Sequence, residues 1–317
     1  MAHRIIGQRS LADQVVSAST KLCKNLEKLH NAIDWKPIKE ALAGLYASEF
    51  GRASYPPLAM FKILILQQWY RLSDEQMEEA LHDRISFRYF CGFSLADKTP
   101  DKTTLSTFRT ALSELKIDLL DVLNHQIEQK GLIVKKGTLI DATVIEADVS
   151  RPKGGEQSAV DPQAGWTKKR GAYTYGYKAY IGVDEGTEFV RKVQTTSADY
   201  HDSQVFYPCI SGDEISVYAD KAYDSQKHRT ELKKNCINDR ILYRAKPNKA
   251  LNPFQKILNK AYSKKRSAVE RVFGTWKRVY GYTRARYRGW EKNQLHLTLL
   301  AVAHNIKRCA NIVVVVA

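Results

Sequence analysis

The spacing of hydrophobic residues along the chain changes at Gly137. Before this point apolar residues recur every three or four positions, which is typical of helices that bury one face. After it, short runs of β-branched and aromatic residues alternate with helical stretches. The pattern therefore predicts a helical first part and an α/β second part.

Three clear helical patterns occupy the first part. One covers residues 58–69, the next follows Ser73 and runs toward residue 90, and the third follows Asp101 and extends to residue 127. Ser73 and Asp101 are residue types that cap helix N-termini. A weaker pattern over residues 11–33 predicts one further helix, to which we assign no chemistry.

Three helices joined by short turns resemble a helix-turn-helix, a motif that places one helix in the major groove of DNA. The residues of the third helix that would then lie toward DNA are Lys102, Thr103, Ser106 and Arg109. A helical bundle that only packs or dimerises has the same hydrophobic pattern. Both interpretations remain open at this point.

The second part begins with a buried strand, TLIDATVIEA. Further strands are predicted at residues 177–183, 189–194, 215–219 and 240–244, and helices at 203–210, 225–235, 263–280 and 292–311. This order is that of a ribonuclease-H-like α/β domain. Residues 149–171 are rich in Gly, Pro, Lys and Gln, so we expect a long loop there.

These patterns divide the chain into three regions. Residues 1–50 form an N-terminal helical segment, residues 51–133 a helix-turn-helix-like DNA-binding region, and residues 134–311 an α/β domain with a basic C-terminal end. The length of 317 residues agrees with more than one domain.

The formal charge of the chain is +16, and most of it lies near the C-terminus. Residues 251–317 contain 14 Lys and Arg but only Glu270 and Glu291 as acidic residues, a net of +12, which leaves +4 for the preceding 250 residues. Aromatic residues are interleaved with the basic ones, and disordered tails rarely contain them. We therefore expect a folded surface that faces a polyanion.

Other sequence features narrow the class of protein. The five cysteines form no CxxC pair, which favours reduced thiols in a cytosol. No apolar run approaches the roughly 20 residues of a membrane span, and the N-terminus lacks the apolar segment of a signal peptide.

Two acidic residues are associated with predicted strands. Asp141 lies inside an apolar strand, where a carboxylate is costly unless it is paired or binds a cation. Asp220 ends the strand at 215–219, and ligands commonly bind at the carboxyl ends of strands in open α/β sheets. Carboxylates from separate segments are what a two-metal phosphoryl-transfer site requires.

Glu270 is the third acidic candidate and lies in the predicted helix 263–280. Arg266, four residues earlier, and Lys277, seven residues later, share its helix face. Both are suited to phosphate groups. The helix would then present one carboxylate between two cations.

Each carboxylate also has a simpler explanation. Asp141 and Asp220 are in positions where Asp often caps a turn or a helix, and Glu270 could pair with Arg266. Glu146 is the main rival as a metal ligand. It lies five residues after Asp141 and therefore on the opposite face of the strand.

Four segments resemble the insertion-sequence-five family of bacterial DDE transposases. They are LIDATVIEA, YGYKAYIGVDEGTEFVRKVQTTSADYHDS, YADKAYDS and RSAVERVFGTWK, and the likeness extends from Pro57 to Arg308. Arg266, Glu270 and Lys277 match the family signature Tyr-x2-Arg-x3-Glu-x6-Lys. Ser263 stands at the tyrosine position of that signature, and Tyr262 lies one residue earlier.

Two further strings resemble DNA-binding parts of that family. Pro100, Asp101, Thr104, Phe108 and Arg109 match its amino-terminal DNA-binding region, and Trp166–Lys169 resembles a basic loop before the second strand. The resemblance therefore adds Lys168 and Lys169 to Lys102 and Arg109 as candidates for DNA contact.

The resemblance implies a ribonuclease-H-like DDE integrase domain preceded by a helical DNA-binding region. Asp141, Asp220 and Glu270 would bind two Mg²⁺ ions, or Mn²⁺, while Arg266 and Lys277 hold phosphates. The protein would cut the ends of an insertion sequence and join them to target DNA. We expect double-stranded DNA as partner, a homodimer on paired ends in the bacterial cytosol, and neither a membrane nor a small-molecule substrate.

Two other functions agree with the same residues. A ribonuclease-H-like nuclease would share the acidic site but would cleave without joining. A DNA-binding regulator derived from a transposase would need only the helical region and the basic C-terminal end.

Overall fold

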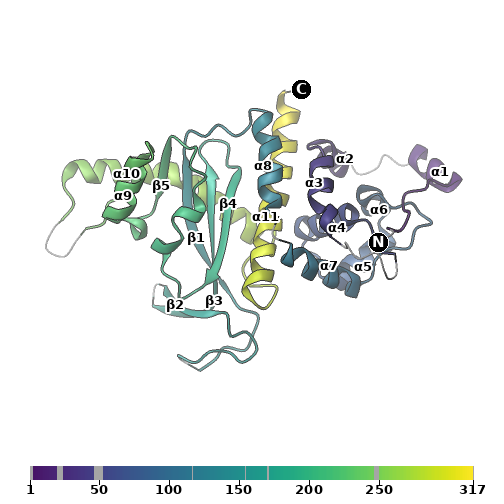
Figure 1. The fold of residues 1–317 in the computed structure, drawn as a ribbon, viewed down its shortest axis with the longest axis horizontal. Coiled ribbons are helices and arrows are strands. Elements are labelled where there is room, and N and C mark those ends of the chain that lie inside the picture. The colour runs from purple at the N-terminus through teal and green to yellow at the C-terminus, as the bar shows by residue number, and fades with distance from the viewer. Residues whose placement is uncertain are drawn as a thin grey trace. The chain divides into compact units, whose positions relative to one another are not determined.

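The computed structural model describes residues 3–19, 24–45, 53–115, 117–153, 155–169, 171–245 and 250–316. The chain divides into two compact units (Figure 1). Unit 1 comprises Met1–Ile127 with Val302–Ala317, and unit 2 comprises Glu128–Ala301. No helix in the described part of the chain has the length and apolar character needed to cross a membrane.

Unit 1 is built from helices, and α4 lies at its centre. Residues Ala59 to Trp69 of α4 are all buried, as expected for a helix that is apolar on every side. Ser73 and Gln76 form the capping box that starts α5, and Asp101 caps α7 by accepting a hydrogen bond from the Thr104 N–H at 2.7 Å. The helices are α1 (Leu11–Ser19), α2 (Lys24–Asn31), α3 (Lys36–Ala41), α4 (Pro57–Tyr70), α5 (Asp74–Asp83), α6 (Ile85–Cys91), α7 (Lys102–Glu114) and α8 (Leu119–Gln129).

The last helix, α11 (Trp290–Val316), supplies the remaining part of unit 1. The indole N–H of Trp69 donates to the Ala303 carbonyl at 2.8 Å, and the Asn305 amide donates to the Asn124 side chain at 2.8 Å. Val302, Ile306 and Cys309 are buried. Residues from this late segment therefore complete a core whose other helices come from the start of the chain.

The helices of unit 1 are shorter and more numerous than the hydrophobic pattern predicts. Within the expected helix 11–33 the described residues form α1 and α2, and residues 20–23 lie outside the described part. The second expected helix breaks at Arg84, whose backbone is extended. The third ends where Leu115 is extended, and α8 begins after Asp118, whose carboxylate accepts from the Asp121 N–H at 3.0 Å. Five helices, α4 to α8, thus replace the three that were expected between residues 58 and 127.

Unit 2 contains a six-stranded sheet in which β3 pairs with β4 on one side and β1 on the other, followed by β5 and β6. β3 runs antiparallel to both of its neighbours, β1 and β4, while β1, β5 and β6 are parallel. This is the ribonuclease-H-like arrangement that the sequence predicts. The strands are β1 (Thr138–Glu146), β2 (Gly165–Lys169), β3 (Ala172–Asp184), β4 (Val190–Ser197), β5 (Ser216–Ala219) and β6 (Asn238–Ile241).

Alternation along β1 gives the sheet two different faces. Ile140 and Ala142 pack into a hydrophobic cluster with Val217 and Ala219 of β5, whereas Asp141 points to the opposite face. The helices of this unit are α9 (Gln226–Lys234), α10 (Pro253–Arg278) and the first part of α11. α10 packs against β1 and β5 (Figure 1).

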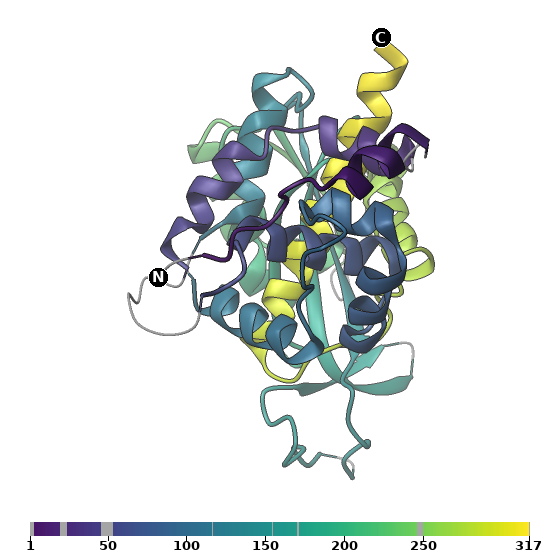
Figure 2. The same cartoon turned by 90° about the vertical axis from the view of Figure 1, so that its right-hand side faces the viewer.

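Three expectations about unit 2 are wrong. The expected loop 149–171 contains β2, which pairs antiparallel with the start of β3 and extends away from the rest of the sheet (Figure 2). The expected helix 203–210 is two short 3-10 helices, Asp202–Val205 and Tyr207–Cys209. α10 begins at Pro253, because Asn252 and Gln255 form a capping box there.

Candidate active site

Asp141 and Asp220 lie side by side at one edge of the parallel strands. The register pairs Thr138 with Val217 and Leu139 with Tyr218. Asp220 is the residue directly after β5, which ends at Ala219. When the same register is continued by two residues, Asp220 lies next to Asp141. Neighbouring strands are about 4.8 Å apart, so the two carboxylates can act on one ligand.

Arg266 of α10 bridges these two aspartates. One nitrogen of its guanidinium lies 3.2 Å from Asp141 Oδ1, and the other lies 3.7 Å from Asp220 Oδ1. Arg266 is only 7% exposed. The buried guanidinium therefore forms the floor of an acidic site whose carboxylates reach toward solvent.

Glu270 stands one helical turn beyond Arg266 and is exposed. Arg266 pairs with the aspartates and not with Glu270, so the simple ion pair within the helix is not what the structure shows. Burial raises the pKa of Asp141, and the charges of Asp220 and Glu270 raise it further, while Arg266 and the Ala142 N–H oppose this. The charge of Glu270 therefore reaches the Asp141 carboxyl, although no ion pair joins Glu270 to Arg266.

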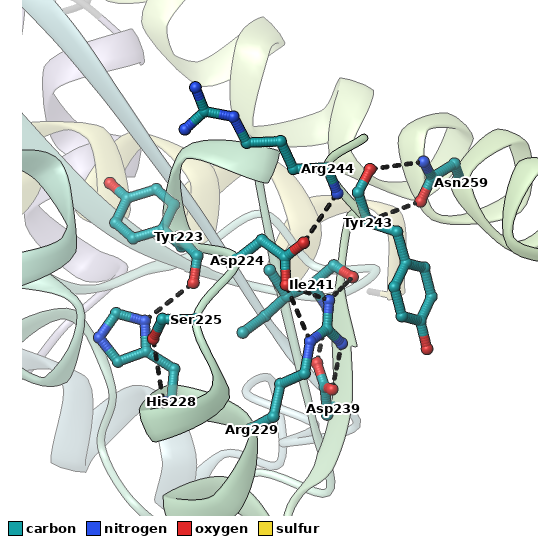
Figure 3. A network of polar contacts seen from close by, with 10 residues as sticks. All are labelled: Tyr223, Asp224, Ser225, His228, Arg229, Asp239, Ile241, Tyr243, Arg244 and Asn259. Atoms are coloured by element: carbon teal, nitrogen blue, oxygen red, sulfur yellow. Dashed lines mark hydrogen bonds and ion pairs between the residues drawn. The ribbon is translucent and has the colours of Figure 1, made fainter. Parts of the chain in front are cut away.

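A polar network holds the segment that follows Asp220 (Figure 3). Asp224 accepts hydrogen bonds from Arg229 Nε at 3.0 Å, from Arg229 Nη2 at 2.9 Å and from the Arg244 N–H at 2.7 Å. Arg229 also pairs with Asp239 of β6 and donates to the Ile241 carbonyl at 3.2 Å. The network fixes the loop after β5 to β6.

Polar contacts also hold α10 against the sheet. The Asn259 amide donates to the Tyr243 carbonyl at 3.0 Å, and its oxygen accepts from the Tyr243 N–H at 2.8 Å (Figure 3). Lys265 donates to Glu185 at 2.5 Å and to the Tyr218 hydroxyl at 2.9 Å. These contacts fix the part of the helix that precedes Arg266.

Tyr262 belongs to this attachment of α10. Its ring is buried and packs edge-on against Tyr218 with centroids 5.9 Å apart, and its hydroxyl accepts from Arg240 at 2.9 Å. Ser263, which stands at the signature's tyrosine position, is exposed. The displaced tyrosine therefore packs against the sheet.

The predicted DNA contacts of unit 2 are less buried than Arg266. Lys277 is partly exposed and lies about two turns beyond Glu270 on the same face of α10. Lys168 is part of β2, with its ammonium 4.8 Å from the centre of the Tyr173 ring. Lys169 ends β2, and its side chain lies outside the described part.

The two predicted contacts of unit 1 differ in accessibility. Lys102 begins α7 and pairs with Glu75 at 2.6 Å, with its side chain half exposed. Arg109 is 5% exposed and pairs with Asp74 at 2.5 Å. The helical spacing could have indicated this burial, because Arg109 lies four residues after Leu105 and three before Leu112, on the buried face of α7.

The donor set agrees with hard divalent cations, which prefer carboxylate oxygens. Asp141 and Asp220 already converge on a shared positive group, the Arg266 guanidinium. Among the described residues, no three His, Cys, Asp or Glu side chains are close enough to form a complete metal cage. Glu270 or the loop of Asp220 would therefore have to adjust when an ion binds.

Sequence reasoning missed the residues that support the site. One of them is Asp224, whose side chain is 16% exposed and paired with Arg229. The sequence offers one indication of this pair, because Asp224 and Arg229 are only five residues apart, on either side of Ser225, the N-cap of α9. The contacts of Asp239 with Arg229 and of Asn259 with Tyr243 could not be predicted, because the two partners are ten or more residues apart in the sequence.

Comparison with known proteins agrees with both units. The sequence model described as "Transposase domain (DUF772)" matches residues 13–111, and the model described as "Transposase DDE domain" matches residues 133–306.

Two solved structures were also compared with the chain. A piggyBac transposase synaptic complex with hairpin DNA has a TM-score of 0.44 and 13% identity, covering 96% of this chain and 76% of that one. A pre-cleavage Mos1 transpososome has a TM-score of 0.20 and 10% identity, covering 83% of this chain and 98% of that one. The DDE match covers more than half of the chain, so the protein belongs to the family of transposases with a DDE domain.

Proposed function

We propose that this transposase cuts the ends of an insertion sequence and joins them to target DNA at Asp141, Asp220 and Glu270. The observation that carries the proposal is the convergence of Asp141 of β1 and Asp220 after β5 on one buried arginine of α10, the helix that also carries Glu270. The site is open to solvent, as a polymeric substrate requires. We assign the protein to the insertion-sequence-five family on its matching segments.

The three carboxylates would hold two Mg²⁺ ions, or Mn²⁺. Bound there, the ions would supply the electrostatic stabilisation of the attacking and leaving oxygens that phosphoryl transfer needs. The protein's own contribution is to fix the carboxylates on β1, the loop after β5 and α10, so that little reorganisation accompanies the reaction. No covalent intermediate with the protein is involved in this proposal.

Lys277 would contact a phosphate beside the site, because it shares the face of α10 that carries Glu270. Lys168 and Lys169 would contact DNA from the β2–β3 hairpin, and Lys102 from the start of α7. The large excess of Lys and Arg beyond residue 250 would attract the backbone of double-stranded DNA. We further propose that a homodimer acts on paired ends in the bacterial cytosol.

Cleavage and joining of DNA that carries the element ends, measured with Mg²⁺, tests this function. Asp141→Asn, Asp220→Asn and Glu270→Gln are each expected to lower both rates at least about a thousandfold while DNA binding is preserved. Glu146→Gln is the matched control, because Glu146 is exposed on the other face of β1. Its rates should stay near those of the wild type.

The outcomes separate the alternatives. An Asp220→Asn protein as active as the wild type would exclude the assigned site. Cleavage without a joined product would identify a nuclease, and DNA binding without cleavage in the wild type would identify a regulator.

A further inference from the structure

Arg266 occupies the place between Asp141 and Asp220 that a shared cation would take. Its guanidinium lies 3.2 Å from the Asp141 carboxylate and 3.7 Å from the Asp220 carboxylate. The Arg266 side chain is buried, so its positive charge offsets the two carboxylates from the interior of the protein. Without this arginine, two adjacent carboxylates would repel each other at the end of the parallel strands.

A divalent ion on the same carboxylates cannot leave Arg266 unaffected. Ligand distances of roughly 2.1 Å would bring the ion within about 5 Å of the guanidinium nitrogen that now contacts Asp141. The two positive groups would repel each other strongly at that separation. Metal and guanidinium therefore compete for one pair of carboxylates.

One nitrogen of the Arg266 guanidinium group lacks a hydrogen bond within the described part of the chain. Its Nε is buried and has no hydrogen-bond partner among the described residues. A fully satisfied buried arginine would be costly to move, whereas this one lacks a bond that a new acceptor could supply. A phosphate oxygen accepts hydrogen bonds from guanidinium groups well.

We propose that Arg266 is an internal counter-ion that holds Asp141 and Asp220 together without metal and passes to a DNA phosphate when substrate enters. This inference rests on the proposed function. The transfer frees both carboxylates for Mg²⁺, so binding of DNA and binding of metal favour each other. By linkage, the factor by which DNA strengthens metal binding equals the factor by which metal strengthens DNA binding.

The competition is measured by Mg²⁺ titration calorimetry on the full chain without DNA. Arg266→Gln should bind Mg²⁺ on the order of tenfold more tightly than the wild type, because the competing charge is gone. Arg266→Lys keeps the charge and should fall between the two. Arg271→Gln is the matched control, since Arg271 is on the same helix, exposed and paired with Glu188.

Thermal unfolding gives a readout that does not depend on activity. Without metal, Arg266→Gln should melt below the wild type, because the aspartates lose their counter-ion, and Mg²⁺ should raise its Tm more than that of the wild type. A variant that melts low and gains nothing from Mg²⁺ would assign Arg266 to packing alone and overturn the proposal. If Arg266→Gln does not fold, the comparison of Arg266→Lys with Arg271→Gln decides.

The coupling is measured as the effect of Ca²⁺ on binding of a short DNA duplex. Ca²⁺ should strengthen binding severalfold more in the wild type than in Arg266→Gln, and Arg271→Gln should behave as the wild type. Equal effects in all three proteins would overturn the proposal.

The metal site itself is checked separately. Asp141→Asn and Asp220→Asn should lose Mg²⁺ binding. If both retain it, the proposed metal ligands are wrong. If both lose it while Arg266→Gln binds Mg²⁺ no more tightly than Arg271→Gln, only the counter-ion proposal fails.

Discussion

Lys62 is a charged residue inside the most apolar helix of unit 1. It is 6% exposed, its ammonium lies 4.5 Å from the Trp35 ring centre and 5.5 Å from that of Phe90, and His30 Nδ1 is 3.3 Å away. Aromatic faces attract the cation but replace only part of its lost hydration. Burial accordingly lowers the pKa of Lys62 to about 8.

Replacing Lys62 with Met should stabilise the protein by about 1–3 kcal/mol at pH 7. The charged form costs free energy only in the folded state, so the unfolded chain holds the proton more tightly. Stability of the wild type should therefore rise as the pH increases from about 8 to 10.5, the ordinary pKa of lysine.

Chemical denaturation across this pH range tests the effect. The rise should be absent in Lys62→Met and present in Lys39→Met, whose side chain is exposed. Equal pH profiles for the wild type and Lys62→Met would contradict the assigned cost of burial.

Tyr262 differs from the catalytic candidates in facing the sheet. Tyr262→Phe should cost about 1 kcal/mol, because the hydrogen bond from Arg240 is lost while the ring contact with Tyr218 remains. Cleavage should stay within about twofold of the wild type. Loss of cleavage at unchanged stability would show that the hydroxyl serves the reaction.

At the scale of elements, the hydrophobic pattern correctly predicted those helices and strands whose limits depend on residues close in the sequence. The strand around Asp141 and the end of β5 before Asp220 were both found where expected, because burial and alternation are visible within a few residues. The expected helices were wrong where a break has no Gly or Pro, as at Arg84 and Leu115. Tertiary packing decides such breaks.

The geometry of the candidate site was predictable only in part. Asp141 and Asp220 could be proposed from strand position, but their shared contact with Arg266 depends on the register between β1 and β5 and on the seating of α10. Neither is encoded locally. Arg109 is different, because its spacing from Leu105 and Leu112 already placed it on the buried face of α7, although the motif suggested a DNA contact.

A mutation in the polar network around Asp224 should also impair the candidate active site, because the network holds the loop that follows β5. Asp224→Ala removes three hydrogen bonds and leaves Arg229 with less charge compensation, which should cost about 2–4 kcal/mol. Cleavage should also fall severalfold, since the loop begins at Asp220.

Arg244→Ala is the control for this network, because Arg244 contributes its backbone N–H and its side chain points away (Figure 3). Stability of that variant should change by less than about 0.5 kcal/mol. Urea denaturation of both variants makes the comparison. Equal losses would show that the carboxylate of Asp224 does not hold the loop.

At the scale of the whole molecule, the net charge of +16 predicts strongly salt-dependent DNA binding. Each phosphate contact contributes a slope of about −0.9 to the plot of log K against log salt concentration. Lys168→Ala should lower the magnitude of that slope by roughly one and weaken binding to all sequences similarly. Fluorescence anisotropy at several salt concentrations measures it.

Lys233→Ala, which removes an exposed lysine at the end of α9, serves as the control and should leave the slope unchanged. An unchanged slope for Lys168→Ala as well would remove the β2–β3 hairpin from the DNA-binding surface.

The late segment of α11 that completes unit 1 has a consequence for synthesis on the ribosome. Ala303, Asn305 and Cys309 are made long after Trp69, Asn124 and Ala32, their partners in the same core. At translation rates of roughly 5–20 residues per second the delay is about ten to fifty seconds. During that time the helices translated first must wait with part of their apolar surface uncovered. The two units would thus mature at nearly the same time, because unit 2 also needs the first part of α11, which ends at Ala301.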